Sequence, residues 1–133
     1  MKIDGGCHCG AITYEAEIDP DQVVICHCTD CQTLSGSAFR TVALTAPENF
    51  KFLTGTPKTY VKTAQSGNKR AQTFCPDCGT PIYSGPTDNT PGLLGVRLGT
   101  TRQRDALAPK TQAWVGSALA WTQELAAVPP VGE

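Results

Sequence analysis

The chain has 133 residues, of which 40% are hydrophobic and 17% charged, so we expect one folded domain over residues 1–133 and exclude a mostly disordered chain. Its 11 basic and 12 acidic residues leave a formal net charge of −1 without a basic stripe, so we expect no nucleic-acid partner. No apolar stretch approaches the roughly 20 residues that span a bilayer, and the start lacks the apolar run of a signal peptide, so we expect no membrane association and a cytoplasmic location.

Short runs with β-strand character follow one another along most of the chain. Residues 11–18 alternate between apolar and polar side chains, such as Tyr14 and Glu15, which predicts a half-buried strand. Gly, Pro, Asn and Asp residues separate further predicted strands at residues 22–26, 37–44, 49–53, 58–63, 71–74, 80–83 and 93–98. The pattern indicates an antiparallel, mainly β domain.

Little helix is expected. Residues 29–33 have room for a turn or a single helical turn and nothing longer. Four residues near the C-terminus recur at helical spacing, namely Trp114, Ala118, Trp121 and Leu125. Gly116 weakens a helix there, so the segment is equally compatible with an extended chain. Residues 127–133 should form a frayed tail.

Seven cysteines fall in three clusters along the chain. An odd number is poorly explained by disulfides, and without a signal peptide the compartment should be reducing. Metal binding accounts for seven if they divide into four and three. The clusters are Cys7 with Cys9, then Cys26, Cys28 and Cys31, then Cys75 with Cys78.

The first and third clusters predict a closed zinc site. Residues i and i+2 of an extended strand point to the same face, so Cys7 and Cys9 can present both sulfurs to one ion. Cys75-Pro-Asp-Cys78-Gly79 has the spacing of a turn that curls two sulfurs around a metal. Together these four thiolates, here called the four-cysteine group, complete a tetrahedral site that selects zinc over hard cations.

The middle cluster supplies only three ligands. Three protein ligands plus one open position is the arrangement of a catalytic zinc, so we expect one at Cys26, Cys28 and Cys31, here called the three-cysteine group. Other readings stay open: a redox pair at the third cluster, an iron–sulfur cluster, or two structural sites with a histidine completing the trio. His8 and His27 each lie between two cysteines and should point away from the metal, as packed or exposed residues.

Four segments together resemble the glutathione-dependent formaldehyde-activating enzyme and centromere protein V-like family. They are GCHCG at 6–10, CHCTDC at 26–31, SGSAF at 35–39 and FCPDCGTP at 74–81. The resemblance runs from residue 5 to about residue 121. It implies a β-tent of small antiparallel sheets, a structural zinc on the first and third clusters and a second zinc on the middle one. One departure is Gln112, at a place where relatives often carry His.

The chemistry of the open site favours thiols over water. Zinc with three thiolates carries a local charge of −1 and is a weak Lewis acid, but it lowers the pKa of an entering thiol. Ser35, Gly36 and Ser37 follow the third ligand and could donate to an aldehyde oxygen, or form a plain turn. This fits the reaction that the resemblance implies, a carbon–sulfur lyase step in which glutathione adds to formaldehyde or is released from it.

Two other functions use zinc-binding cysteines. A zinc nucleobase deaminase needs a His-x-Glu motif, and neither histidine is followed two residues later by Glu. The second is a non-enzymatic, zinc-stabilised binding module. A cleft beside the three-cysteine group would favour the enzyme, and an exposed apolar patch without a pocket would favour the module.

Overall fold

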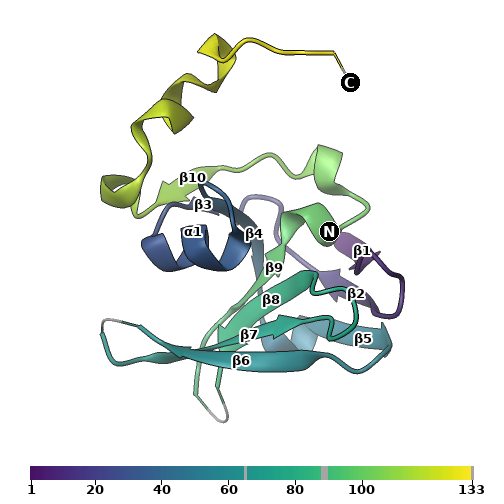
Figure 1. Ribbon diagram of the computed structural model, residues 1–133. Coiled ribbons are helices and arrows are strands. Elements are labelled where there is room, and N and C mark those ends of the chain that lie inside the picture. The colour runs from purple at the N-terminus through teal and green to yellow at the C-terminus, as the bar shows by residue number, and fades with distance from the viewer. Residues whose placement is uncertain (65, 88–89, 133) are drawn as a thin grey trace.

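The computed structural model describes residues 1–64, 66–87 and 90–132, and within them the chain is mainly β (Figure 1). Its strands are β1 Lys2–Gly6, β2 Thr13–Glu17, β3 Val23–Cys26, β4 Arg40–Thr45, β5 Phe50–Thr54, β6 Lys58–Thr63, β7 Lys69–Phe74, β8 Pro81–Pro86, β9 Leu94–Arg97 and β10 Thr111–Ala113. The α-helix is α1, Thr29–Ser35. Short 3₁₀ helices lie at Pro47–Asn49, Leu98–Thr100, Arg104–Ala106, Val115–Ser117 and Ala120–Ala127.

The strands form two sheets. The smaller has the antiparallel order β1-β2-β5, and the larger has the order β10-β3-β4-β9-β8-β7-β6. All pairs are antiparallel except β10 with β3, which run parallel with Gln112 opposite Ile25. The prediction of a purely antiparallel fold of small sheets is therefore wrong at this edge and for the seven-stranded sheet. The connection of residues 98–110 is long enough to return the chain in the parallel direction.

Each predicted strand has a counterpart within a few residues, whereas β1 and β10 were missed. β1 ends in Gly5 and Gly6, residues that weaken any strand pattern. The structure explains Gly5, since a Cβ there would collide with the carbonyl oxygen of Thr100 and the hydroxyl of Tyr14. β10 has three residues and no alternation that a sequence pattern could detect.

Aromatic side chains connect the two sheets. The Tyr14 ring of β2 stacks on Phe50 of β5 with centroids 4.9 Å apart, and Phe50 meets Tyr83 of β8 edge-on at 5.0 Å. The predicted alternation in β2 is confirmed, because Tyr14 and Ala16 are buried and their neighbours are more exposed. The remaining core is aliphatic and includes Ile3, Ile12, Ile18, Val23, Ile82, Val96 and Leu107.

Helix α1 extends two residues beyond the predicted turn. At its start the Cys28 sulfur accepts a hydrogen bond from the Cys31 backbone N–H at 3.2 Å, which caps the first turn. At its end Gly36 adopts the left-handed φ of 65° and its N–H bonds back to the last turn. These two caps stabilise a helix longer than the residue pattern suggested.

The C-terminal segment is neither an α-helix nor a strand. Trp114 takes a left-handed φ of 56°, and 3₁₀ helices follow it to Ala127. Figure 1 shows this segment beyond β10 and α1, away from the sheets. Residues 128–132 are exposed without regular structure, so their fraying stays a prediction, and Glu133 lies outside the described residues. In the part of the chain described, no helix is long and apolar enough to cross a membrane.

Candidate metal centre and adjoining cavity

The four-cysteine group joins the two sheets. Cys7 and Cys9 lie between β1 and β2 of the small sheet, and Cys75 and Cys78 lie between β7 and β8 of the large one. Their sulfur atoms are all within 4.8 Å of one another, with Cys7 and Cys9 at 3.6 Å and Cys9 and Cys75 at 3.8 Å. Four sulfurs at about 2.3 Å from a tetrahedral zinc would be about 3.8 Å apart. The donor set and its spacing therefore fit a zinc ion.

The first pair reaches this geometry through a turn. The Gly10 N–H donates to the Cys7 carbonyl at 3.2 Å, the Cys7 N–H donates to the Ile12 carbonyl at 3.0 Å, and the Ile12 N–H donates to the Cys7 sulfur at 3.2 Å. Our argument from strand alternation was wrong, because residues 7–11 leave the strand and curl, with Gly10 at a φ of 83°.

The second pair forms the predicted turn. The Gly79 N–H donates to the Cys75 carbonyl at 2.8 Å, and Gly79 has a φ of 80°. The Thr80 hydroxyl lies 3.2 Å from the Cys78 sulfur, and this hydrogen bond lowers the pKa of Cys78 to about 5. The same hydroxyl oxygen accepts from the His8 N–H at 3.1 Å. Thr80 thus links the two cysteine pairs and favours the thiolate form that binds a metal.

The three-cysteine group is local. Cys26 is the last residue of β3, Cys28 caps α1 and Cys31 lies in the first turn of the helix. Their sulfurs also lie within 4.8 Å of one another, and all three residues are half-buried. The hydrogen bond with Cys31 lowers the pKa of Cys26 to about 5, and the same interaction raises the pKa of Cys31. The three sulfurs are close enough to share a proton by hydrogen bonding. A soft metal cation could take the place of that proton.

Neither histidine belongs to a cysteine group in the described structure. His27 is 1% exposed, its Nε2 lies 2.7 Å from the Gln112 Oε1, and its ring packs against Phe39. Because Oε1 can only accept, Nε2 carries the hydrogen in this arrangement. His8 is exposed. Both histidines thus lie as expected, as packed or exposed residues outside the cysteine groups, and Gln112 is the partner of His27.

Polar contacts of two side chains, Gln32 and Asp30, hold α1 in place, and the sequence had indicated neither. The Gln32 side-chain amide donates to the His27 carbonyl at 2.9 Å and to the Ser117 carbonyl at 3.0 Å. On the other side of the helix, Lys62 of β6 pairs with Asp30 at 2.8 Å. These contacts attach the helix to the residue that follows β3, to the C-terminal segment and to β6.

The Ser35-Gly36-Ser37 loop ends the helix. The Ser35 hydroxyl donates to the Gln32 carbonyl at 3.3 Å, and its oxygen accepts from the Ser37 N–H at 3.2 Å. The Ser37 hydroxyl has no hydrogen bond within the described ranges and is exposed. The predicted role of the loop in binding substrate stays a prediction, with the Ser37 hydroxyl as its unoccupied donor.

Two buried arginines lie beside the three-cysteine group, and our sequence reasoning missed them. Arg40 opposes Cys26 across the β3–β4 pair, and Arg97 ends β9, the next strand of the sheet. Each is only 7% exposed. The Gln72 Oε1 of β7 accepts from both, at 3.2 Å from Arg40 and 2.9 Å from Arg97. The available signal was a charged residue inside each of two apolar strand patterns, which is easily read as an exposed position.

Burial, with a smaller contribution from the charge of Arg40, lowers the pKa of Arg97 to about 9, while nearby Cys31 acts in the opposite sense. Burial also lowers the pKa of Arg40, and Cys31 again opposes it. Both guanidinium groups are charged at neutral pH, because an arginine side chain is effectively always protonated in proteins.

A cavity of about 270 Å³ adjoins these groups. Arg40, Arg97 and Gln72 supply its polar wall, and its apolar wall includes Leu34, Phe74 and Pro81. Leu34 follows Cys31 by one helical turn, and Arg40 is the cross-strand neighbour of Cys26. The cavity therefore lies near the three-cysteine group, whose cysteines are not themselves among its lining residues.

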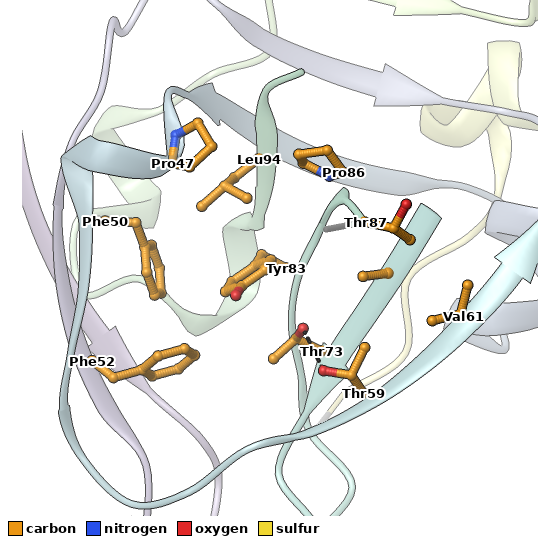
Figure 2. A pocket seen from close by; sticks show the side chains of 11 residues that line it. Pro47, Phe50, Phe52, Thr59, Val61, Thr73, Tyr83, Pro86, Thr87 and Leu94 are labelled. Atoms are coloured by element: carbon orange, nitrogen blue, oxygen red, sulfur yellow. Dashed lines mark hydrogen bonds between the residues drawn. The ribbon is translucent and has the colours of Figure 1, made fainter. Parts of the chain in front are cut away.

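A larger cavity, of about 540 Å³, adjoins the first and shares Thr73 and Tyr83 with it. Figure 2 shows Phe50, Phe52 and Tyr83 facing one another along one side of it. Among the described residues that line it there is no cysteine and no charged side chain. The smaller cavity also has no cysteine among its described lining residues, but its wall carries two charged side chains and lies near the three-cysteine group, so it is the better candidate for chemistry.

Comparison with known proteins gives two findings. A family model described as "Glutathione-dependent formaldehyde-activating enzyme" matches residues 2–117, which include all seven cysteines. Among solved structures, the chain is similar to a crystal structure of a Rhodobacter sphaeroides protein, with 20% sequence identity and a TM-score of 0.62 over 83% of this chain and 99% of that one. At this identity the structural likeness supports the fold alone.

Proposed function

Because the chain belongs to the glutathione-dependent formaldehyde-activating enzyme family, we propose that it joins glutathione to formaldehyde. A bond forms between the thiol sulfur and the aldehyde carbon, and the thiol proton ends on the aldehyde oxygen. The product is S-hydroxymethylglutathione. The reverse step breaks the same bond, so the activity is that of a carbon–sulfur lyase.

One observation carries the proposal: three sulfurs converge beside a cavity that has charged groups in its wall. Three thiolates occupy three of the four tetrahedral positions of zinc and leave one for a ligand. Zinc bound there would supply an electrophilic centre that lowers the pKa of an entering thiol. Cys26, Cys28 and Cys31 would hold the ion, and the half-buried setting limits competition from water.

Other residues would act on the aldehyde and on the charge of the site. The Ser37 hydroxyl, and backbone groups of Ser35 and Gly36 if the loop shifts, would donate to the aldehyde oxygen as negative charge develops there. Arg40 and Arg97 place positive charge near the thiolates. That charge stabilises an anionic sulfur in a site poor in water.

A second zinc, at the four-cysteine group, would be structural. It would hold the small sheet against the large one, as in the β-tent that the family resemblance implies. The cysteines converge as two metal-binding groups, and metal-bound cysteines would suit a reducing compartment such as the cytoplasm. We expect a small thiol and a small aldehyde as partners, and neither a membrane nor nucleic acid.

Exchange NMR tests the proposal. The reaction proceeds in solution without protein, so the rate of exchange between glutathione and its adduct must be compared with that background. We expect wild-type protein to raise the exchange rate and Cys31→Ser to return it to background. Thr33→Ser, on the exposed side of the same helix, should behave as wild type.

Equal rates with wild type, with Cys31→Ser and without protein would contradict the enzyme. That result would favour the alternative, a zinc-stabilised binding module. The charged wall of the cavity speaks for the enzyme, since an interaction surface would more often be an exposed apolar patch.

A further inference from the structure

Arg40 and Arg97 form a buried pair of like charges. Within residues 1–64, 66–87 and 90–132, neither makes an ion pair with a carboxylate. Gln72 contacts both guanidinium groups, but its amide is neutral and cancels no charge. Burying a charge without a counter-charge is costly, so two adjacent buried cations indicate that an anion completes the site.

The pair also has hydrogen-bond donors to spare. A guanidinium group carries five N–H donors. In the described structure Arg40 makes one side-chain hydrogen bond, to Gln72. Arg97 bonds to Gln72 at 2.9 Å and to the Gly95 carbonyl at 3.4 Å, while its buried Nε has no partner among the described residues. Both side chains line the cavity of about 270 Å³, so a ligand there could reach the free donors.

The neighbouring cysteines account for the two charges only in part. Zinc with three thiolates would carry a charge of −1 against +2 on the two arginines, so one positive charge has no counter-charge until a thiol binds as a thiolate. Among the described residues no hydrogen bond joins either guanidinium group to a cysteine sulfur, so their spare N–H donors are open to an anionic group elsewhere on the ligand. The rest of the cavity wall is largely apolar and includes Leu34, Phe74 and Pro81, so little water competes for the two guanidinium groups.

The strand register sets the distance between Arg40 and the three-cysteine group. Cys26 and Arg40 are directly opposite on neighbouring antiparallel strands, so their Cα atoms lie about 4.5 to 5.5 Å apart and their side chains share one face of the sheet. An anionic group a few bonds from a thiol could therefore reach Arg40 while the thiol reaches the three-cysteine group.

We propose that Arg40 and Arg97 bind the glycine carboxylate of glutathione, so the cavity selects thiols that carry a carboxylate without a neighbouring ammonium group. This rests on the proposed function, because it takes the three-cysteine group as the place of the thiol. The fork of N–H groups on arginine matches a carboxylate with two parallel hydrogen bonds. The γ-glutamyl end of glutathione carries an ammonium group as well, which two guanidinium groups would repel.

The test compares glutathione with glutathione amide, in which the glycine carboxylate is a neutral carboxamide of nearly the same shape. Calorimetric titration of zinc-loaded wild-type protein should give an affinity for glutathione about 10-fold to 100-fold higher than for the amide. In Arg97→Met the two affinities should differ by less than about threefold. Arg102→Met is the matched control, since that side chain is 79% exposed and pairs with Asp4, and it should keep the wild-type ratio.

The absorption spectrum of the cobalt-substituted protein separates the two possible failures. If both thiols alter the spectrum and bind wild-type protein equally well, the thiol site stands and the carboxylate site is wrong. If neither thiol alters the spectrum, the proposed function fails and the carboxylate assignment fails with it. The ratio in wild-type protein decides the question even if Arg97→Met does not fold, and Arg40→Met provides a second variant.

Discussion

The two cysteine groups use the same ligand in opposite ways. In the four-cysteine group, Cys9 and Cys75 are 66 residues apart in sequence and belong to turns of different sheets. In the three-cysteine group, all the sulfurs come from residues 26–31, at the junction of one strand with one short helix. A metal in the first group would cross-link distant parts of the chain, and a metal in the second would close only a local loop. The sequence separation of the ligands therefore indicates a role in folding for the four-cysteine group and a role in chemistry for the three-cysteine group.

The surroundings of the two groups differ as well. The four-cysteine group offers a full tetrahedral set and is held by backbone turns. The three-cysteine group leaves a position open and lies near two buried arginines and a cavity. Stability should thus depend on the first group, and ligand binding on the second.

The largest expected effect is on folding. Cys78→Ser removes one ligand of the four-cysteine group, and structural zinc contributes roughly 10 to 16 kcal/mol of apparent binding free energy. A typical domain is stable by only about 5 to 15 kcal/mol. We expect the variant to be insoluble, or unfolded when its circular dichroism is followed with temperature. An unchanged melting temperature would falsify the structural assignment.

A smaller effect is expected at the second group. Cys31→Ser should stay folded, because the three-cysteine group joins no distant segments. Its zinc content, measured by elemental analysis, should fall from about two to about one ion per chain. Thr33→Ser serves as the control and should retain both ions. Two ions retained in Cys31→Ser, or precipitation like that of Cys78→Ser, would show that the division into four and three is wrong.

The smallest effect concerns the core between the sheets, independent of either metal. Burial raises the pKa of Tyr14 to about 12, and its hydroxyl lies 2.6 Å from the Thr100 hydroxyl. Because the folded pKa lies above the unfolded value of about 10, the contribution of Tyr14 to stability is complete below pH 10 and is lost as the pH rises toward 12. Tyr14→Phe should cost about 1 kcal/mol at neutral pH through the lost hydrogen bond.

Melting temperatures of both proteins from pH 7 to pH 12 provide the measurement. The difference in melting temperature between wild type and Tyr14→Phe should become smaller above pH 10, while the zinc content of both proteins stays the same. Parallel curves over the whole range would argue against a raised pKa. Loss of zinc in Tyr14→Phe would mean that Tyr14 also supports the four-cysteine group, so the effect of the variant on stability would not be independent of the metal.

Local features of the sequence determined the ligand clusters and most strands. Spacing alone divided the seven cysteines into the two groups that the structure brings together, because each pair or trio is held by a few neighbouring residues. Alternation placed β2 with Tyr14 inward for the same reason, since strand geometry acts over two residues. Where our local reasoning named the wrong geometry, as for Cys7 and Cys9, the sulfurs still met, through a turn rather than a strand.

Only the tertiary structure decided which sheets the four-cysteine group joins and what surrounds the three-cysteine group. The burial of Arg40 and Arg97 depends on β4 and β9 pairing inside a seven-stranded sheet, and that pairing connects residues far apart in the chain. The partner of His27 is Gln112, brought to it by the parallel β10 that no local pattern indicated. Such contacts depend on strand order, and a sequence pattern with a period of two residues carries no information about strand order.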